Sequence, residues 1–287
     1  KLFIFFLCRM KVISQCAVKR GGKGMTSSIY IHLDTTSNIV LTQGINAGDF
    51  HRGIVHPPKN ILLLNPSSEL GEFENHTTMK IIRGEAAVSQ FLQNLSKNRL
   101  LLENKWIDFT DLAMLKELTP LEISELLYFG HMKTHLYSPF FYKLQNNFVY
   151  FDLENGLNRT YYRYLDEFYR ILASKITHIA LERLNDRRSF FRKAQPVSKV
   201  NSEILKPLKE AMKEGIFFSF EHAITENGEF LIPIYFVEET PQLNRALSKN
   251  EEEQFLGYLI YNQDRQTWRL KVEDQLFGFS TKNTLIS

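Results

Sequence analysis

Two histidines near the middle of the sequence, His131 and His135, have a spacing that suits metal or acid–base chemistry. Residues four apart lie on one face of a helix, so both imidazoles could reach the same metal ion. We expect Gly130 to end the preceding helix just before this pair, and no Asp or Glu stands nearby at ligand spacing. The pair is therefore a weak catalytic candidate, and no metal site is predicted.

A second polar cluster occupies the segment 44–59, which we expect to be an irregular loop stiffened by two prolines. It contains Asp49, His51 and His56. Functional side chains are common on loops, so Asp49 and His51 are also weak catalytic candidates. Three such residues arise easily by chance in a polar loop, and the cluster alone does not identify an enzyme.

The strongest local charge lies in the segment 175–214, which holds ten Lys and Arg against five acids. On a helix Arg183 lies one turn from Arg187, and Arg188 lies one turn from Arg192. Planar guanidinium groups suit phosphate or carboxylate, so we predict that these four arginines bind a ligand. The alternative is that they are solvated or pair with acids of the same chain.

Aromatic residues are dense just before this segment, from 140 to 169. Aromatic platforms next to cations are typical of single-stranded nucleic-acid binding. Strand alternation makes Tyr150 and Tyr161 the members that could face solvent, and we predict them as ligand-binding residues. Core packing is the alternative use of these rings.

Several common enzyme signatures are missing from the sequence. It has no phosphate-binding loop, no Gly-x-Gly-x-x-Gly, no Gly-x-Ser-x-Gly and no His-Glu-x-x-His. We therefore predict no cofactor. The sequence leaves open whether the protein is an enzyme.

Residues 1–24 differ from the rest in composition. They carry six basic residues and no acid, so the net charge of +3 becomes −3 for 25–287, and both cysteines lie here. We expect a non-native or disordered extension, because the codons for 20–24 can form a purine-rich bacterial ribosome-binding site before Met25. A signal or membrane role and a folded element are the alternatives. No apolar run is long enough to span a membrane, so we expect a cytoplasmic bacterial protein without a membrane partner.

Several pairs of β-rich runs are joined by turn residues and predict β-hairpins. Asn-Gly at 155–156 and at 227–228 favours a type I′ turn, because both central residues need positive φ. Pro233 lacks an N–H donor, so its strand should lie at a sheet edge or carry a bulge. The expected hairpins are 28–33 with 39–43, 148–153 with 157–162, 217–224 with 230–237 and 255–261 with 267–272, with further strands at 61–64 and 79–82.

Helices are expected between these hairpins. Thr119 and Glu122 form a capping box at the start of a helix that we expect to end at Gly130. Apolar residues three and four apart predict a long amphipathic helix over about 163–192. Further helices are expected over 85–101 and 199–214.

Hairpins without alternating helices favour an α+β fold, with antiparallel β-hairpins packed against the long amphipathic helix and a helical central segment. Beyond the extension, we expect a β-rich N-terminal subdomain (25–84), a helical segment (85–135) and an α+β C-terminal part (136–287) sharing one core. A clean two-domain split is the alternative.

These features favour a non-catalytic binding or regulatory protein whose basic-aromatic surface meets a protein or a nucleic acid. The alternative is an enzyme acting on an anionic small molecule, with histidines for acid–base or metal chemistry and arginines as the anion clamp. A pocket that brings a histidine and an arginine together would favour the enzyme. Oligomeric state is not set by the sequence.

Overall fold

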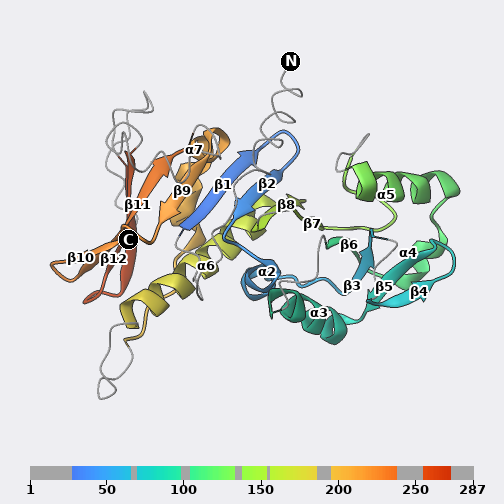
Figure 1. Cartoon of the computed structure of the whole chain (residues 1–287), viewed down its shortest axis with the longest axis horizontal. Helices are drawn as coiled ribbons and strands as arrows, with labels where there is room; N and C mark the ends of the chain where they lie inside the picture. Colours follow the sequence, from blue (N-terminus) through green and yellow to red (C-terminus); the bar gives the residue numbers. More distant parts are fainter. Residues whose placement is uncertain are drawn as a thin grey trace. The chain divides into compact units, whose positions relative to one another are not determined.

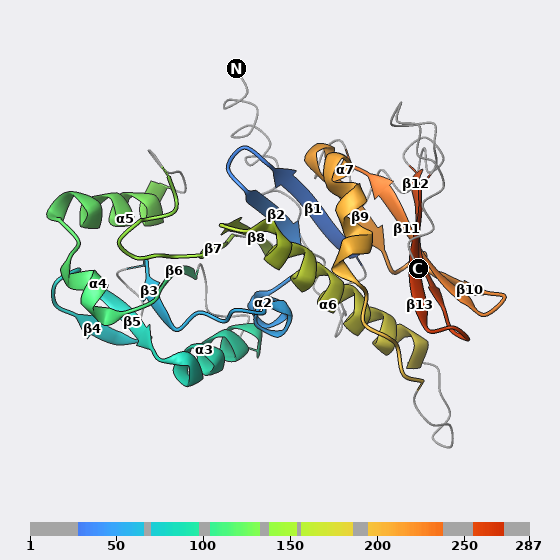
Figure 2. The same ribbon diagram turned by 180° about the vertical axis from the view of Figure 1, so that it is seen from behind.

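The computed structural model describes residues 28–65, 70–97, 104–132, 138–153, 156–185, 195–237 and 255–272. These stretches form thirteen strands, the helices α2–α7 and the 3-10 helix η2 (Figures 1 and 2). Neighbouring strands run antiparallel, and helices are interspersed among the hairpins. The predicted α+β class is confirmed.

Two compact units divide the chain. The central unit comprises Asp34–Leu41 and Ile45–Ile171, and the C-terminal unit comprises Lys1–Leu33, Thr42–Gly44 and Leu172–Ser287. The boundaries that we expected after 84 and after 135 both fall inside the central unit. The division into three parts that share one core stays a prediction.

The central unit contains a sheet in the order β8-β7-β6-β3-β5-β4. Strands β6 and β3 lie in the middle of this sheet, although both come well before β8 in the chain. Two of these strands, β4 and β6, were not predicted. The bounds are β3 Asn60–Leu63, β4 Glu72–Glu74, β5 Met79–Arg83, β6 Lys105–Phe109, β7 Phe148–Asp152 and β8 Leu157–Tyr162.

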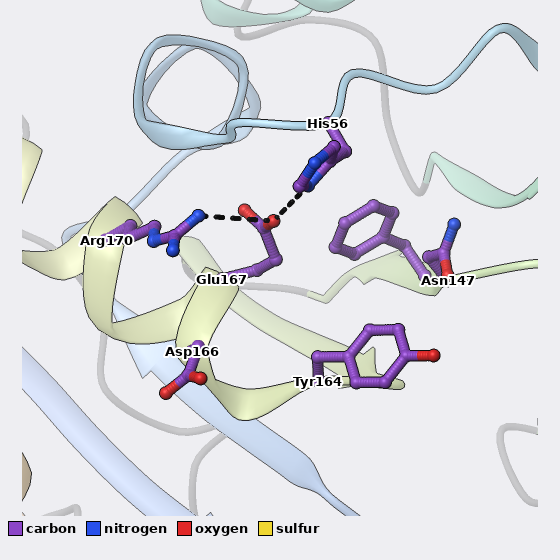
Figure 3. A pocket seen from close by; sticks show the side chains of 7 residues that line it. His56, Asn147, Tyr164, Asp166, Glu167 and Arg170 are labelled. Atoms are coloured by element: carbon purple, nitrogen blue, oxygen red, sulfur yellow. Dashed lines mark hydrogen bonds and ion pairs between the residues drawn. The ribbon is translucent and has the colours of Figure 1, made fainter.

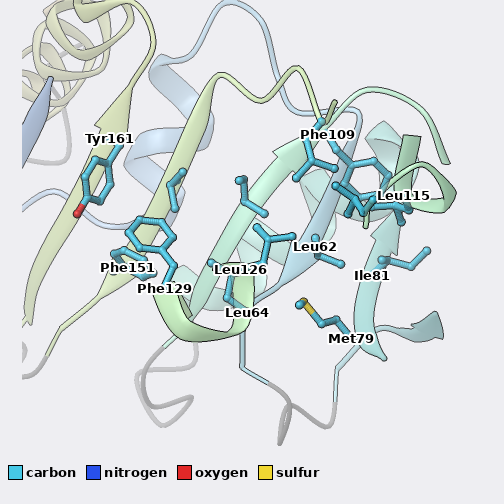
Figure 4. Close-up of a cluster of buried hydrophobic side chains, with 14 of the residues drawn as sticks. Leu62, Leu64, Met79, Ile81, Phe109, Leu115, Leu126, Phe129, Phe151 and Tyr161 are labelled. Carbon is cyan, nitrogen blue, oxygen red and sulfur yellow. The ribbon is translucent and has the colours of Figure 1, made fainter. Parts of the chain in front are cut away.

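An apolar core lies on this sheet beneath helix α5 (Figure 4). Leu62, Phe109 and Phe151 from three strands meet Leu126 and Phe129 from the helix. All five side chains are at most 2% exposed. Burial of apolar surface, at roughly 25 cal/mol per Å², is the term that holds the helix on the sheet.

Of the helices in the described stretches, four lie entirely in the central unit: α2 Ala47–Gly53, α3 Glu85–Lys97, α4 Leu112–Lys116 and α5 Pro120–Met132. The start of α6, up to Ile171, also belongs to this unit. The expectation of an irregular loop over 44–59 is wrong in part, because Asn46 and Asp49 form a capping box that begins α2. The capping box predicted for α5 is confirmed, with the N–H of Thr119 donating to Glu122 Oε2 at 2.7 Å.

The C-terminal unit contains strands in the order β13-β12-β11-β9-β1, with β10 also paired to β11. Strand β1 forms the predicted hairpin with β2. The bounds are β1 Ser28–Asp34, β2 Ile39–Gln43, β9 Ile216–Ser219, β10 Ile224–Glu226, β11 Glu229–Phe236, β12 Phe255–Asn262 and β13 Thr267–Val272. The hairpin predicted at the end of the described chain, β12 with β13, is confirmed.

The strand around Pro233 is not an edge strand. Strand β11 lies between β12 on one side and β9 and β10 on the other, so the edge prediction is wrong. The predicted alternative, a β-bulge, is present, since the register of β11 against β12 shifts between Ile234 and Tyr235. The turn before β11 is as predicted, with positive φ at Asn227 (49°) and Gly228 (76°).

Helix α6 (Leu165–Asn185) lies within the long helix predicted from the sequence. Its amphipathic character is not confirmed: the buried positions include the charged residues Glu167 and Lys175, and only Asp166, His178 and Leu181 are exposed. The helix predicted over 199–214 is η2 (Ser202–Leu208) followed by α7 (Lys209–Glu214). Within the described stretches, no helix has the length and apolarity required to cross a bilayer.

Candidate functional site

A pocket of about 380 Å³ lies in the central unit, where the start of α6 faces the loop after α2 (Figure 3). Three short segments supply its lining. The loop after α2 gives one residue, the start of β7 gives two, and α6 with the residue before it gives four. They are His56, Asn147, Phe148, Tyr164, Asp166, Glu167 and Arg170.

Gly53, the last residue of α2, brings this loop close to α6. A Cβ atom at Gly53 would overlap the backbone of Ile171, so only glycine permits this approach. The chain leaves the helix at Ile54, in extended conformation, and reaches His56 two residues later. The close contact of the two helices therefore sets the distance between His56 and α6.

A buried carboxylate, Asp108 on β6, fixes the opposite wall. Its Oδ1 accepts the backbone N–H of Asn147 at 2.9 Å and of Phe148 at 2.6 Å. Arg163 holds the same turn from the other side, because its Nε donates to the carbonyl of Asn146 at 2.8 Å. Burial raises the pKa of Asp108 to about 7, against the opposing effects of these amide hydrogen bonds and of the Arg163 charge.

The carboxylate of Glu167 is the centre of the pocket. The side chain is only 8% exposed, and its two oxygens contact three groups. Oε2 accepts the backbone N–H of Val55 at 3.1 Å, Oε1 lies 2.9 Å from Nδ1 of His56, and Nη1 of Arg170 lies 3.9 Å from Oε1. One buried negative charge thus lies between a histidine and an arginine of the pocket lining (Figure 3).

The contact with Glu167 determines where His56 carries its proton. An ionised carboxylate can only accept hydrogen bonds, so Nδ1 must be the N–H donor. Neutral His56 then has its lone pair on Nε2, and the side chain is 78% exposed. A carboxylate that orients an imidazole in this way leaves Nε2 ready to take a proton from a bound molecule.

Other hydrogen-bond donors line the pocket. The side-chain amide of Asn147 and the hydroxyl of Tyr164 have no partner among the residues that the structure describes, and the guanidinium of Arg170 has only the 3.9 Å contact with Glu167. Figure 3 shows Asp166 pointing away from His56, Glu167 and Arg170. Arg170, Asn147 and Tyr164 therefore offer donors to a ligand, beside the carboxylate of Asp166, which also lines the pocket.

Of the four arginines predicted to bind a ligand, the structure describes only Arg183. Arg183 is half-buried near the end of α6, and its Nε is buried without a hydrogen-bond partner in the described part of the chain. Arg187, Arg188 and Arg192 lie outside the described residues. The ligand-binding role of the four arginines stays a prediction.

The exposure predicted for Tyr150 and Tyr161 is wrong, because both rings are 1% exposed. Tyr150 stacks on Trp106 at 5.2 Å between centroids and donates its hydroxyl to Asp152 at 2.8 Å. Tyr161 packs edge-on against Phe129 at 5.5 Å. Both faces of these strands are covered, so strand alternation did not separate a solvent face from a core face.

The prediction that a helix ends at Gly130, just before the histidine pair, is wrong. Helix α5 continues through Gly130 to Met132, which places His131 on the helix as an exposed residue. Gly130 lies against the carbonyl of Leu64, where a Cβ has no room, so it serves a close approach and does not end the helix. His135 lies outside the described residues.

Asp49 and His51 have structural partners. Asp49 is 2% exposed, caps α2 and forms an ion pair with Arg52. His51 Nε2 lies 2.9 Å from Oγ of Ser89, and burial, with a smaller effect of the Arg52 charge, lowers the pKa of His51. In the described ranges, no group of three or more His, Cys, Asp or Glu residues could hold a metal ion.

Sequence reasoning selected the loop of His56 but missed its partners. Glu167 and Arg170 lie before the basic segment that began at 175, and Asn147 is an ordinary turn residue. One signal was present in the sequence: an acid, Glu167, stands next to Phe168 inside the apolar pattern of the helix. A buried acid requires a partner, which could have been sought among nearby cations.

Comparison of the chain with protein-family models, with curated proteins and with solved structures gives no match.

Proposed function

We propose that this protein binds a small molecule carrying an oxyanion, a carboxylate or a phosphate, in the pocket around Glu167. The observation that carries the proposal is the convergence of His56 and Arg170 on one buried carboxylate. This is the arrangement expected for the alternative interpretation of the sequence, an anionic small molecule held by histidine and arginine. The histidine is His56, and the arginine comes from outside the predicted cluster.

The size and lining of the pocket support a small ligand. A volume of about 380 Å³ lies within the range of roughly 300–1,000 Å³ typical of small-molecule sites. Phe148 gives it an apolar wall, and Tyr164, whose side chain is largely exposed, stands at the rim. A few polar groups on an apolar wall are the usual means of orienting a small ligand.

The charge arrangement supports an anion. The carboxylate of Glu167 already accepts from Val55 and His56, so it offers little to a cationic ligand. Arg170 is 41% exposed and holds Glu167 only at 3.9 Å, which leaves its remaining N–H donors for a second oxyanion. Guanidinium groups bind carboxylate and phosphate in bidentate geometry, through two parallel hydrogen bonds.

Binding of two probes, succinate and inorganic phosphate, tests the proposal by calorimetric titration at constant ionic strength. We expect at least one probe to bind and Arg170→Met to weaken it by about tenfold or more, since a charge-assisted hydrogen bond is worth about 1.5–3 kcal/mol. Arg269→Met is the matched control, because Arg269 is also half-exposed and paired with a glutamate, in the other unit. Absence of binding by both probes, or equal affinity of both variants, contradicts the proposal.

A protein or nucleic-acid partner for the arginine cluster stays a prediction, as do the bacterial origin and the cytoplasmic location. Gel-shift and pull-down assays with the double variant Arg187→Glu and Arg188→Glu test the partner. Binding that is unchanged for every partner found would remove these arginines from consideration.

A further inference from the structure

We propose that the same pocket hydrolyses small anionic esters, with His56 as the general base that activates a water molecule. The inference rests on the proposed anion site and assigns a reaction to it. It is carried by the hydrogen bond between Nδ1 of His56 and Oε1 of Glu167, at 2.9 Å, which directs the lone pair of Nε2 to the exposed side of the ring.

Water is the nucleophile because the lining offers no better one. None of the seven residues that line the described pocket is a serine, a threonine or a cysteine. The histidine therefore has no serine or threonine hydroxyl and no thiol to activate. A general base that acts on water needs only the lone pair of Nε2 and a substrate held beside it.

The reaction balances without any further reactant. Nε2 of His56 takes a proton from water while the water oxygen bonds to the ester carbonyl carbon. The tetrahedral intermediate collapses, the ester C–O bond breaks, and the imidazolium returns the proton to the leaving oxygen. The products are a carboxylic acid and an alcohol, and His56 is regenerated.

Other residues of the lining have separate roles. Glu167 is a positioning residue, which holds His56 in the reactive tautomer and stabilises the imidazolium that forms. Arg170 binds the anionic end of the substrate. The amide of Asn147 and the hydroxyl of Tyr164 are donors for the oxyanion that develops on the carbonyl oxygen.

His56 has a ring nitrogen open to a ligand, whereas His51, on helix α2, has none. Nε2 of His51 is already within 2.9 Å of Oγ of Ser89, and Nδ1 of His51 is buried. Neither nitrogen of His51 is open to a ligand. His56 is the residue of the 49–56 cluster that the fold leaves accessible.

Hydrolysis of 4-nitrophenyl hydrogen succinate, which carries a carboxylate and an ester, tests the proposal. We expect saturable kinetics, inhibition by succinate, and a loss of about 100-fold or more in kcat for His56→Gln. His178→Gln is the matched control, because His178 is also exposed and its Nδ1 lies 3.5 Å from Glu182. This control should keep the activity of the unmodified protein.

Two further variants separate positioning from binding. Glu167→Gln keeps an oxygen that can accept the N–H of Val55, so we expect a lower kcat with little change in KM. Arg170→Met should raise KM for the succinate ester, because Arg170 binds its carboxylate. A Glu167→Gln variant with normal kcat would overturn the positioning role. Circular dichroism checks that each variant is folded.

The outcomes distinguish the two proposals. If succinate binds but hydrolysis is unsaturable, or falls equally in His56→Gln and His178→Gln, the hydrolytic role is overturned and the anion site stands. If neither probe binds the unmodified protein, the anion site falls and the hydrolytic role falls with it.

Discussion

Replacing Asp108 with Asn should remove a pH dependence from the stability of the central unit. Asp108 is fully buried on β6, and burial raises its pKa from 3.8 in a model peptide to about 7 in the fold. Asn is uncharged at every pH, and its Oδ1 can still accept the N–H groups of Asn147 and Phe148. The substitution therefore removes the charge and keeps the two shorter hydrogen bonds.

The direction in which stability changes with pH follows from the number of protons bound by the folded and the unfolded protein. Between pH 4 and pH 7 the folded protein holds a proton on Asp108 that the unfolded chain has released, so this residue makes the fold less stable as the pH rises. A difference of about three pKa units corresponds to about 4 kcal/mol, present in full below pH 4 and lost by pH 7. Asp108→Asn should gain that amount relative to the unmodified protein over the same range.

Urea unfolding at a series of pH values, followed by tryptophan fluorescence, measures this difference. Trp106 lies on β6 near Asp108 and is fully buried, and the Trp268→Phe background removes the second tryptophan signal. Asp111→Asn is the matched control. It makes the same chemical change at the start of α4, where Asn caps a helix as well as Asp does.

The free energy of unfolding of the unmodified protein is subtracted from that of Asp108→Asn at each pH. This difference removes the contribution of all other titrating groups. Parallel pH profiles for Asp108→Asn and the unmodified protein between pH 4 and pH 7 would refute the argument. So would a gain of equal size in Asp111→Asn, because that result would assign the effect to the loss of any negative charge and not to the buried carboxylate.

Three other substitutions test how the fold builds the site. Gly53→Ala should destabilise the protein by about 2 kcal/mol and weaken succinate binding, since the new Cβ meets the backbone of Ile171; normal melting and binding would exclude this close approach. Thr119→Ala should cost about 1 kcal/mol through loss of the α5 cap, measured by urea unfolding, and no loss would contradict the capping box. Tyr150→Ala should cost about 3–5 kcal/mol as a core truncation, and an unchanged midpoint would restore an exposed role for this ring.

The proposals for the pocket depend on one buried acid. A carboxylate removed from water is costly unless it is paired and hydrogen-bonded. Glu167 meets this requirement with a backbone amide, a histidine and an arginine, of which only the amide is fixed by the course of the backbone. The two side chains therefore satisfy Glu167 and at the same time present a lone pair and unused N–H donors to the pocket.

Local sequence determined the elements whose signals are short-range. The turn at 227–228, the capping box of α5 and the hairpins of β1 with β2, β7 with β8 and β12 with β13 were all predicted, because each depends on residues a few positions apart. Strand order was not predicted. It depends on pairing between distant segments. The strand of Pro233, which was expected at an edge or with a bulge, lies in the interior of a sheet and carries a bulge.

The site was decided by tertiary structure. The sequence placed His56 in a polar cluster, but the residue that orients it lies 111 positions away, and only packing of α2 against α6 through Gly53 brings the two together. Tertiary packing also buried Tyr150, against Phe50 of α2, and Tyr161, against Phe129 of α5, although strand alternation had placed both rings at the surface. Periodicity reports which side of an element is apolar, whereas contacts between distant segments decide which side remains exposed.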